Sequence, residues 1–503
     1  MSEPLVQSVD EVESVESGRG VAAVVVLAAG AGTRMKSQTS KLLHPLCGRS
    51  LLSYAVEAAG ALEPEHLVVV VGHQREQVEQ HLAEIAPHVT IAVQESPRGT
   101  GDAVRSGLVP IPDVHGEVVV TMGDVPLLTG ETLQALVGVH RENADAVTIL
   151  TTDLPDAGAY GRILRDEAGE VAAIVERKDC TPEQAAITEI NAGIYVFDAD
   201  VLRSGLESLT TNNAQGELYL TDVIAFARGR GGHVHPMALE DRWQAEGVND
   251  REQLALLGRI KNDRVCSAWM KAGVTIVDPA STWIEDSVDI EPDVTLLPGT
   301  HLQGATTVRS GATVGPDTTL RDAEVGPGAT VIRTHGNLAT IGARASVGPF
   351  VHLRPGTEIE PDAKVGAFVE LRAAHVVGGE RVPPLTGDYF GDSLRSDRAR
   401  VERTLLCRPS STGGSLNFAR DTRPALRAER RSERGCRCRT MISATDRLIL
   451  ARWSKGKMQP HGSLLTCARL RGTRSSSHST AAMPGTPSPP SPILANGGGG
   501  GRR

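Results

Sequence analysis

The residues best suited to chemistry cluster after an apolar run near the start of the sequence. The segment LAAGAGTRM (27–35) follows the run VAAVVV, and the basic residues Arg34 and Lys41 lie within it and just beyond it. Two glycines and an alanine let the backbone turn tightly, so that its N–H groups can face an anion. A helix after this turn would add the positive end of its dipole. The pattern predicts phosphate binding, although the GK[ST] ending of a Walker loop is missing.

A carboxylate occupies a comparable position later in the chain. Asp124, in TMGDVPLL (121–128), comes where a predicted strand ends and a proline turn begins. A carboxylate at such a point can bind Mg²⁺, which prefers oxygen ligands and substrate phosphates to a full cage of protein ligands. On this motif alone, an aspartate that caps a turn is an equally good explanation.

The segment QESPRGTGDAV (94–104) is a third candidate, because Gly99 and Gly101 lie on either side of Thr100 just before a predicted helix. Backbone groups of such a glycine-lined loop can approach and read the edge of a flat base. Taken by itself, however, the segment is better explained as a simple connection between two elements.

Several polar side chains stand next to apolar, strand-like runs. One buried asparagine is usually structural, but several polar groups near the ends of predicted strands favour a polar substrate such as a sugar. The residues are Glu176, Asn191 and Asn249, within the segments YGRI (160–163), IVERKD (174–179), EINAGIYVF (189–197) and GVNDR (247–251).

Alternating strands and helices over about 21–265 must position these residues. Amphipathic segments at 50–62 and 130–143 predict helices between the strands. This alternation favours a mostly parallel sheet covered by helices on both faces, and such sheets bind ligands at the carboxyl ends of their strands. The β-branched runs that predict strands are 21–29, 66–72, 89–94, 117–124 and 146–152.

Aliphatic residues recur every sixth position over about 275–380. A helix cannot keep one apolar face at this period, whereas a coil with three short strands per turn can, because each sixth residue then points into the same column. We expect an insertion after Leu320, and an end of the period at Val377 because position 383 is proline. The positions in phase are Ile284, Ile290, Leu296, Leu302, Val308, Val314, Leu320, Ile341, Val347, Leu353, Ile359, Val365, Leu371 and Val377.

Charge and composition divide the chain near residue 386. Residues 1–385 carry 30 basic and 53 acidic side chains, whereas residues 386–503 carry 22 and 8. The basic part lacks periodicity and ends in PGTPSPPSPILANGGGGGRR, which predicts disorder. It is either a tail that binds nucleic acid or the product of translation out of frame. The seven cysteines form no spaced framework, and the run 21–29 is too short for a bilayer, so we expect a cytoplasmic protein.

The motifs together resemble a known family. LAAGAGTRM, KLLH, QESPRGTGDAV, GDVPLL, YGRI, INAGIY, NNAQGELYLTDVI and GVNDR occur in order before a six-residue repeat. Over about 21–385 the chain is similar to the bacterial bifunctional N-acetylglucosamine-1-phosphate uridyltransferase/glucosamine-1-phosphate acetyltransferase. The resemblance implies a Rossmann-like nucleotidyltransferase domain, a left-handed parallel β-helix that trimerises, the substrates UTP and N-acetylglucosamine 1-phosphate, and Mg²⁺ as the cofactor.

The resemblance also implies roles for individual residues, carried over by motif. Arg34 and Lys41 are the catalytic residues, which meet the nucleotide phosphates, and Asp124 and Asn249 hold Mg²⁺. The nucleotide is contacted by Leu27, Ala28, Ala29 and Gly30, its uracil by Gln94, Gly99 and Thr100, the substrates beside the metal by Met122, Gly123 and Asp124, and the acetylated sugar by Gly161, Glu176, Asn191 and Asn249.

The chain departs from the family pattern in the second activity. The family's acetyltransferase depends on a histidine base in a VPHLTY-like segment, where this chain has Pro384. Proline has no titratable side chain, so we expect no acetyl transfer. Arg354 matches a sugar-phosphate contact of that second site, and Arg372 replaces a usual lysine. The basic tail replaces the later coils, which predicts a weakened trimer.

The sequence therefore predicts an enzyme with five segments and leaves two alternatives. One alternative is a nucleotidyltransferase for another sugar 1-phosphate, such as glucose 1-phosphate. The other is a scaffold or nucleic-acid-binding protein without catalysis. The basic tail is the only feature that supports this alternative, and the tail lacks the interleaved aromatics of a nucleic-acid-binding segment. The segments are a disordered 1–20, a nucleotidyltransferase domain at 21–250, a linker helix at 251–275, a truncated acetyltransferase β-helix at 276–385 and a tail at 386–503.

Overall fold

The computed structural model describes residues 20–385, 389–390, 440–444, 447–454 and 457–459. The chain divides into two units, residues 1–406 and 407–503. The second unit contains three antiparallel strands, β32 (Thr440–Ala444), β33 (Arg447–Ser454) and β34 (Lys457–Gln459). The disorder predicted for 1–20 and for most of 386–503 falls outside the described residues.

The first unit begins with a mixed sheet in the order β11-β7-β10-β6-β1-β4-β5. β1 pairs in parallel with β4 and β6, whereas β10 runs antiparallel to β6 and β7, so the predicted, mostly parallel sheet is confirmed. All five predicted strands are present. The bounds are β1 Ala23–Ala28, β4 His66–Val71, β5 Thr90–Val93, β6 Glu117–Met122, β7 Val147–Asp153, β10 Glu189–Asp198 and β11 Val234–Ala238, with the hairpins β2 Pro45–Leu46/β3 Arg49–Ser50 and β8 Arg162–Arg165/β9 Val171–Val175.

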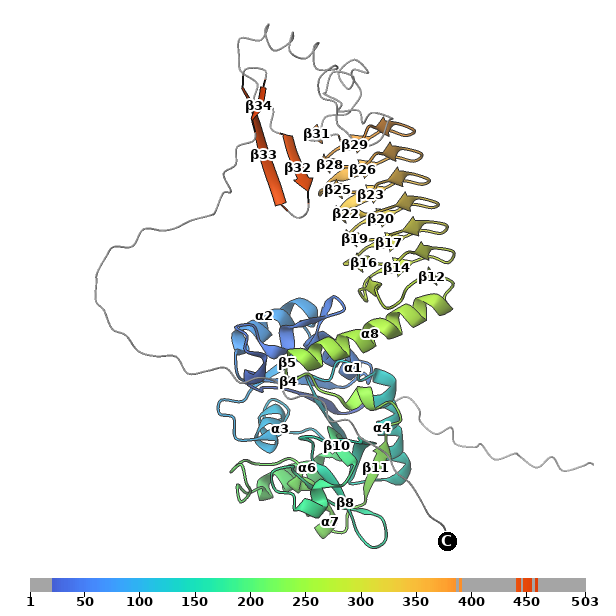
Figure 1. The fold of residues 1–503 in the computed structure, drawn as a ribbon. Helices are drawn as coiled ribbons and strands as arrows, with labels where there is room; N and C mark the ends of the chain where they lie inside the picture. The colour runs from blue at the N-terminus through green and yellow to red at the C-terminus, as the bar shows by residue number, and fades with distance from the viewer. Residues whose placement is uncertain (1–19, 386–388, 391–439, 445–446, 455–456, 460–503) are drawn as a thin grey trace, which may run out of the picture. The chain divides into compact units, whose positions relative to one another are not determined.

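Helices cover both faces of this sheet (Figure 1). Alternate residues of β1 point to opposite faces, so Val24 and Val26 join one apolar cluster and Val25 joins the other. The predicted helices are found as α1 and α4. The helices that pack on the first cluster are α1 (Leu51–Gly60), α2 (Arg75–Ile85) and α4 (Gly130–Asn143), and those on the second are α3 (Thr100–Leu108), α6 (Ala199–Ser208) and α7 (Asp222–Gly229); the short helix α5 spans Pro182–Ala185.

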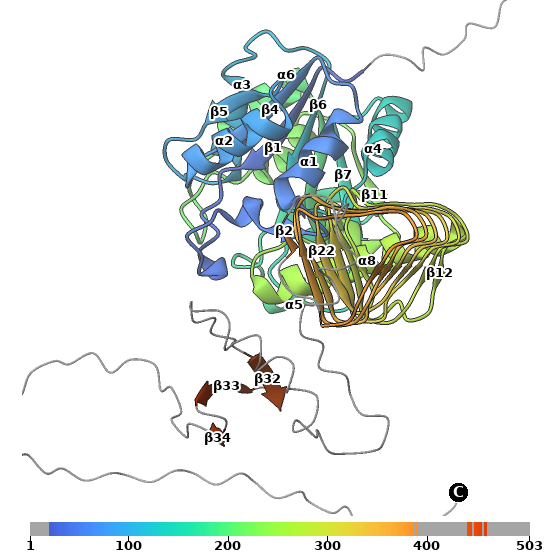
Figure 2. The same cartoon turned by 90° about the horizontal axis from the view of Figure 1, so that it is seen from above.

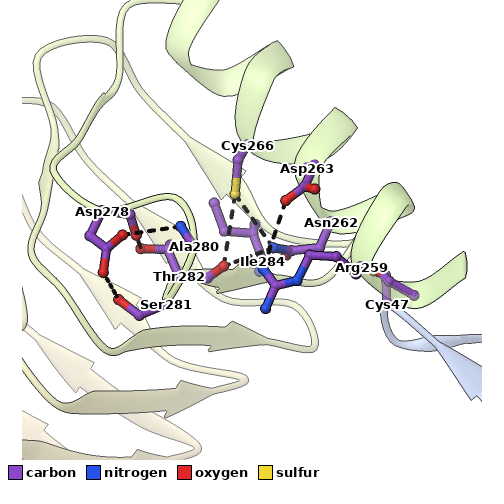
Figure 3. A network of polar contacts seen from close by, with 11 residues as sticks. Cys47, Arg259, Asn262, Asp263, Cys266, Asp278, Ala280, Ser281, Thr282 and Ile284 are labelled. Carbon is purple, nitrogen blue, oxygen red and sulfur yellow. Dashed lines mark hydrogen bonds and ion pairs between the residues drawn. The ribbon is translucent and has the colours of Figure 1, made fainter. Parts of the chain in front are cut away.

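A long helix, α8 (Arg251–Lys271), leads from the sheet into the repeat. Asn262 is fully buried: its amide nitrogen donates to the carbonyl of Thr282 at 2.8 Å and its amide oxygen accepts from the backbone N–H of Ile284 at 3.0 Å (Figure 3). Cys266, one turn further on, lies against the same segment. The side chain of Asn262 thus pairs backbone groups that the first solenoid turn has no preceding coil to satisfy. Among the described residues, no helix is both long and apolar enough to traverse a bilayer.

The repeat forms a left-handed parallel β-helix of three stacked sheets, seen nearly end on in Figure 2. Its interior is a column of aliphatic side chains, each contributing about 1.5–3 kcal/mol on burial. The strands of the three sheets are β12 275–276, β15 295–296, β18 313–314, β21 330–331, β24 346–347, β27 364–365 and β30 381–382; β13 283–284, β16 300–303, β19 318–321, β22 334–337, β25 351–353, β28 369–372 and β31 389–390; and β14 289–290, β17 307–308, β20 324–325, β23 339–341, β26 357–359 and β29 375–376.

The structure corrects the predicted phase of this repeat. Leu302 pairs with Leu320 one turn later, but Leu320 pairs with Gly336 and Gly336 with Leu353, so these turns are shorter rather than interrupted by an insertion. The last predicted in-phase position is also wrong, because Val376, and not Val377, is the fully buried residue at the end of the repeat. Strand β30 then continues the stack beyond the predicted stop. Single deletions at corners change the register without breaking the coil, which a strict period of six does not allow for.

Candidate active site

The glycine-rich segment leaves the sheet at the carboxyl end of β1, as expected, but no α-helix follows it. The short 3₁₀ helices η1 (Thr33–Met35) and η2 (Lys41–Leu43) come instead, so the predicted helix dipole is absent. Gly32 and Lys36 on either side of η1 have left-handed backbones, which end a helix. A Cβ on Gly32 would also lie 2.8 Å from Cβ of Lys41, whereas one on Gly30 would meet nothing within 4 Å. The loop therefore packs on Lys41 and leaves Gly30 open.

Lys41 and Asp124 form an ion pair across the carboxyl ends of β1 and β6. Their side chains are only 12% and 18% exposed, which makes this pair less screened than the surface pairs of the chain. The turn after β6 is tied to β1, because the N–H of Gly123 donates to the carbonyl of Leu27 at 2.9 Å. Asp124 in turn receives at its backbone carbonyl the N–H of Val248. Motifs from three regions of the sequence thus meet at one point.

Arg34 and Asn249 form a second polar contact, in which a guanidinium N–H donates to a neutral amide oxygen at 2.7 Å. Asn249 is held from behind, because its backbone N–H donates to the side-chain oxygen of Gln253 at 2.8 Å. Arg251 donates to the carbonyl of Met35 at the end of η1. The start of α8 is therefore fastened to the glycine-rich loop.

The two predicted metal ligands fit Mg²⁺ by their chemistry. Asp124 offers a carboxylate and Asn249 an amide oxygen, and both lie beside the hydrogen bond from Val248 to Asp124. Mg²⁺ is commonly held by one or two carboxylates together with substrate phosphates and water. A Cβ on Gly247 would stand 3.7 Å from the Asp124 carboxylate, an ordinary contact distance, so the 247–249 segment lies directly beside this carboxylate.

The predicted base-binding loop lies after β5. Gln94 is 8% exposed and its side chain lies under the loop, where its amide nitrogen donates to the carbonyl of Gly99 at 3.1 Å. Gly99 has φ 112°, and a Cβ there would lie 2.5 Å from the carbonyl of Leu218, so only glycine fits. The hydroxyl of Thr100 accepts from the N–H of Leu220 at 3.1 Å and keeps its own hydrogen for donation. The loop is therefore fixed by the 217–221 segment.

The predicted sugar-binding residues gather around β8 and β10. Gly161 and Asn191 are joined by a backbone hydrogen bond of 3.0 Å, and a Cβ on Gly161 would lie 3.6 Å from a carboxylate oxygen of Glu176. The side chain of Asn191 is 7% exposed and donates to the hydroxyl of Tyr195 at 2.6 Å. Burial raises the pKa of Glu176, against the opposing hydrogen bond from Thr221. These groups form a polar lining suited to hydroxyl and amide groups of a sugar.

Sequence reasoning missed Tyr160 and Glu246, which link the sugar-binding and metal-binding parts. The hydroxyl of Tyr160 donates to the Glu246 carboxylate at 2.9 Å and accepts from the N–H of Gly247. Burial raises the pKa of Tyr160, and the Glu246 carboxylate raises it further. Tyr160 lies directly before the glycine of YGRI, so its place in that motif was the available signal. The partner, 86 residues away, has no local signal.

Arg354 lies in the β-helix, in line with its assignment to the second activity. It is ion-paired with Glu370, and Arg372 also lies 3.7 Å from that carboxylate. The hydrogen bond from Arg354 holds the pKa of Glu370 below its usual range, although burial opposes the shift. The rings of His352 and His335 meet edge to face, with centroids 5.4 Å apart. Strands β22, β25 and β28 thus present a polar face.

The nucleotidyl transferase family profile matches residues 23–250, which include the glycine-rich loop and the pair of Lys41 with Asp124, so this part of the chain is a nucleotidyltransferase domain. The bifunctional protein GlmU of Cutibacterium acnes is 55% identical over 381 residues, which cover 74% of this chain and 90% of that relative. Those of Pseudarthrobacter chlorophenolicus and Mycolicibacterium gilvum are 53% and 55% identical over 75% and 76% of this chain, and 77% of each relative. The chain belongs to the GlmU family of uridyltransferases, which confirms the resemblance.

Proposed function

We propose that the crevice at the ends of β1 and β6 transfers a uridylyl group from UTP to N-acetylglucosamine 1-phosphate, releasing pyrophosphate. The observation that carries this proposal is the meeting of Lys41 with Asp124 and of Arg34 with Asn249 in one place. Gln94, Gly99 and Thr100 read the uracil, and the lining around Glu176 and Asn191 holds the acetylated sugar. We place this reaction in the cytoplasm, where UTP is available.

The mechanism needs charge compensation rather than a base. The phosphate oxygen of the sugar phosphate is already an anion when it attacks the α-phosphorus of UTP, in line with the departing pyrophosphate. Two like charges about 4 Å apart repel by roughly 4 kcal/mol at an effective dielectric of 20, so their uncompensated approach is slow. Lys41 and Arg34 offset this repulsion and stabilise charge on the leaving group. Asp124 and Asn249 would hold Mg²⁺, which would supply further positive charge beside the phosphates.

The test of the function is pyrophosphate release by the purified protein with UTP, N-acetylglucosamine 1-phosphate and MgCl₂. We expect turnover that stops when EDTA removes the divalent cation and returns when Mg²⁺ is restored. Glucose 1-phosphate in place of the acetylated sugar phosphate should react much more slowly, because the sugar-binding wall would leave its polar groups unpaired. Failure to release pyrophosphate from UTP would refute the proposal, and faster reaction with glucose 1-phosphate would favour the alternative substrate.

We also propose that acetyl transfer to glucosamine 1-phosphate is lost in this chain. Pro384 stands where the family pattern has its histidine base and is exposed on the last described turn of the β-helix. The ring of proline carries no group that can accept the proton of an amine. Arg354 and its neighbours remain as the phosphate-binding part of a site without its base.

Association into a trimer through the β-helix is a further proposal, supported by an exposed apolar column. Phe350 and Phe368 stack in parallel with centroids 5.0 Å apart, and they are 50% and 59% exposed. Arg333 covers Phe350 at 5.5 Å. Exposed stacked aromatics of this kind are typical of interfaces, and three copies of one solenoid would bury them together.

Light scattering over a range of protein concentrations tests this association. We expect a trimer at high concentration that dissociates on dilution, and a smaller mass at each concentration for Phe350→Ser/Phe368→Ser. Val109→Ser, which replaces a 73% exposed residue of the nucleotidyltransferase domain, serves as the matched control and should leave the mass unchanged. A monomer at every concentration would contradict the proposal.

A further inference from the structure

The side chain of Gln94 has a second partner that the family motifs do not account for. Its amide nitrogen donates to Oδ2 of Asp102 at 2.9 Å as well as to the carbonyl of Gly99. A carbonyl oxygen and a carboxylate are acceptors only, so both must face the NH₂ end of the amide. The orientation of the Gln94 amide therefore follows from its partners, independently of how the two ends of the amide are assigned.

The opposite end of this amide is an acceptor that the protein leaves for a ligand. None of the hydrogen bonds among the described residues involves Oε1 of Gln94, and this oxygen is not one of the buried unpaired polar atoms. The backbone of Gln94 is anchored separately, because its N–H donates to the carbonyl of Val71 at 2.8 Å. The Gln94 amide oxygen thus points away from Gly99 and Asp102, and its direction is fixed by the two contacts of the amide nitrogen.

The direction of this acceptor distinguishes the two common pyrimidines. Uracil carries N–H at N3 and can donate to an amide oxygen, whereas cytosine has a bare N3 with a lone pair that would face this oxygen and repel it. We propose that Asp102 is a positioning residue that selects uracil over cytosine by locking the Gln94 amide with its oxygen outward. This inference rests on the proposed function, in which Gln94 faces the nucleotide base.

The surroundings of Asp102 suit this task. It lies in the first turn of α3, where the positive end of the helix dipole favours the charged carboxylate, which can only accept hydrogen bonds. The loop itself is held by other contacts: the N–H of Gly101 donates to the carbonyl of Leu218 at 2.8 Å, and the N–H of Leu218 to the carbonyl of Arg98 at 2.7 Å. Replacing Asp102 therefore changes the direction of the Gln94 amide more than the path of the loop.

The test compares kcat/KM for UTP and CTP in the wild-type protein and in Asp102→Asn, with N-acetylglucosamine 1-phosphate as the acceptor. An asparagine can pair with either end of the Gln94 amide, so only the carbonyl of Gly99 still holds the amide nitrogen inward and the reversed direction becomes accessible. We expect the preference for UTP over CTP to fall at least tenfold, mainly through KM for the nucleotide. Glu131→Gln, which neutralises an exposed first-turn carboxylate of α4, should keep the wild-type preference. An unchanged preference in Asp102→Asn, with or without lower activity, would overturn the proposal.

A second substitution at position 94 gives a readout that a merely structural role would not produce. Gln94→Glu places two carboxylates against each other and should weaken the use of UTP strongly. The double variant Gln94→Glu/Asp102→Asn offers an amide N–H to the new carboxylate, so it should recover activity with UTP relative to Gln94→Glu alone. No recovery would count against the role of Asp102. If the wild-type protein itself fails to use UTP, the proposed function is lost, which is a distinct result.

Discussion

Asp124→Ala and Lys41→Ala should each lower kcat for uridylyl transfer by about two to three orders of magnitude, the usual cost of removing one preorganised electrostatic group. In the proposed mechanism Asp124 would hold the cation and Lys41 would neutralise phosphate charge, so each change would leave the meeting of two anions uncompensated. Stability should fall by about 1–2 kcal/mol, less than for a fully buried pair, because the Lys41 and Asp124 side chains are 12% and 18% exposed and the charge left behind can still reach water. Steady-state kinetics and urea unfolding on the same samples measure both effects.

The neutral pair Lys41→Met/Asp124→Asn separates catalysis from folding more sharply. Replacing a buried ion pair by neutral groups of similar volume is often neutral or stabilising, by about 1–4 kcal/mol, because the desolvation cost disappears, and the same sign is expected for this largely buried pair. We expect the double variant to be at least as stable as the wild-type protein toward urea and to lack uridylyl transfer. The matched control is Arg49→Met/Glu57→Gln, which removes an ion pair outside the crevice, with 2.6 Å between the guanidinium nitrogen and the carboxylate oxygen. Wild-type turnover in a folded Asp124→Ala protein would remove the metal assignment.

Local patterns were sufficient to predict the elements but not their arrangement. The apolar periodicity placed α4 at its observed bounds, and β-branched runs placed β1, β4 and β6 within two or three residues. Strand order depends on contacts between distant segments, and β10 enters the sheet antiparallel between β6 and β7. The sequence has no local feature that reports this position. The predictions of a helix after the glycine-rich loop and of a strict period of six were wrong for a related reason. Single residues with left-handed backbones end the helix, and single-residue deletions shorten the turns of the β-helix.

The candidate site shows the same division. Residue types and motifs identified Lys41 and Asp124 separately, and only the fold shows that their side chains pair across 83 residues of sequence. Arg34 and Asn249 are 215 residues apart and meet for the same reason. Asp102 had no assigned role, since an acid in the first turn of a helix is common and its partner is known only from the structure.

The second large effect concerns the β-helix, where we expect no acetyl transfer at all. His352 lies two residues before Arg354 and carries an imidazole, whose ring nitrogen is 4.0 Å from the carboxylate of Glu370. Partial burial and the charge of Arg354 lower the pKa of His352, so it is neutral near pH 7 and is chemically able to act as a base. It lies on β25, however, whereas the base position of the family pattern is Pro384, beyond β30. We therefore expect that an amine placed for the family's histidine finds no base among the described residues.

Release of CoA from acetyl-CoA, dependent on glucosamine 1-phosphate, measures this activity. We expect none above background in a sample that releases pyrophosphate from UTP at its normal rate, so that the intact first activity excludes misfolding as the cause. A family member with histidine at the matching position serves as the positive control, and exchanging that histidine for proline should abolish its acetyl transfer while sparing uridylyl transfer. Acetylation of glucosamine 1-phosphate by this chain would show that Pro384 is not decisive. Loss of that acetylation in His352→Asn, with uridylyl transfer unchanged, would then identify His352 as the substitute base.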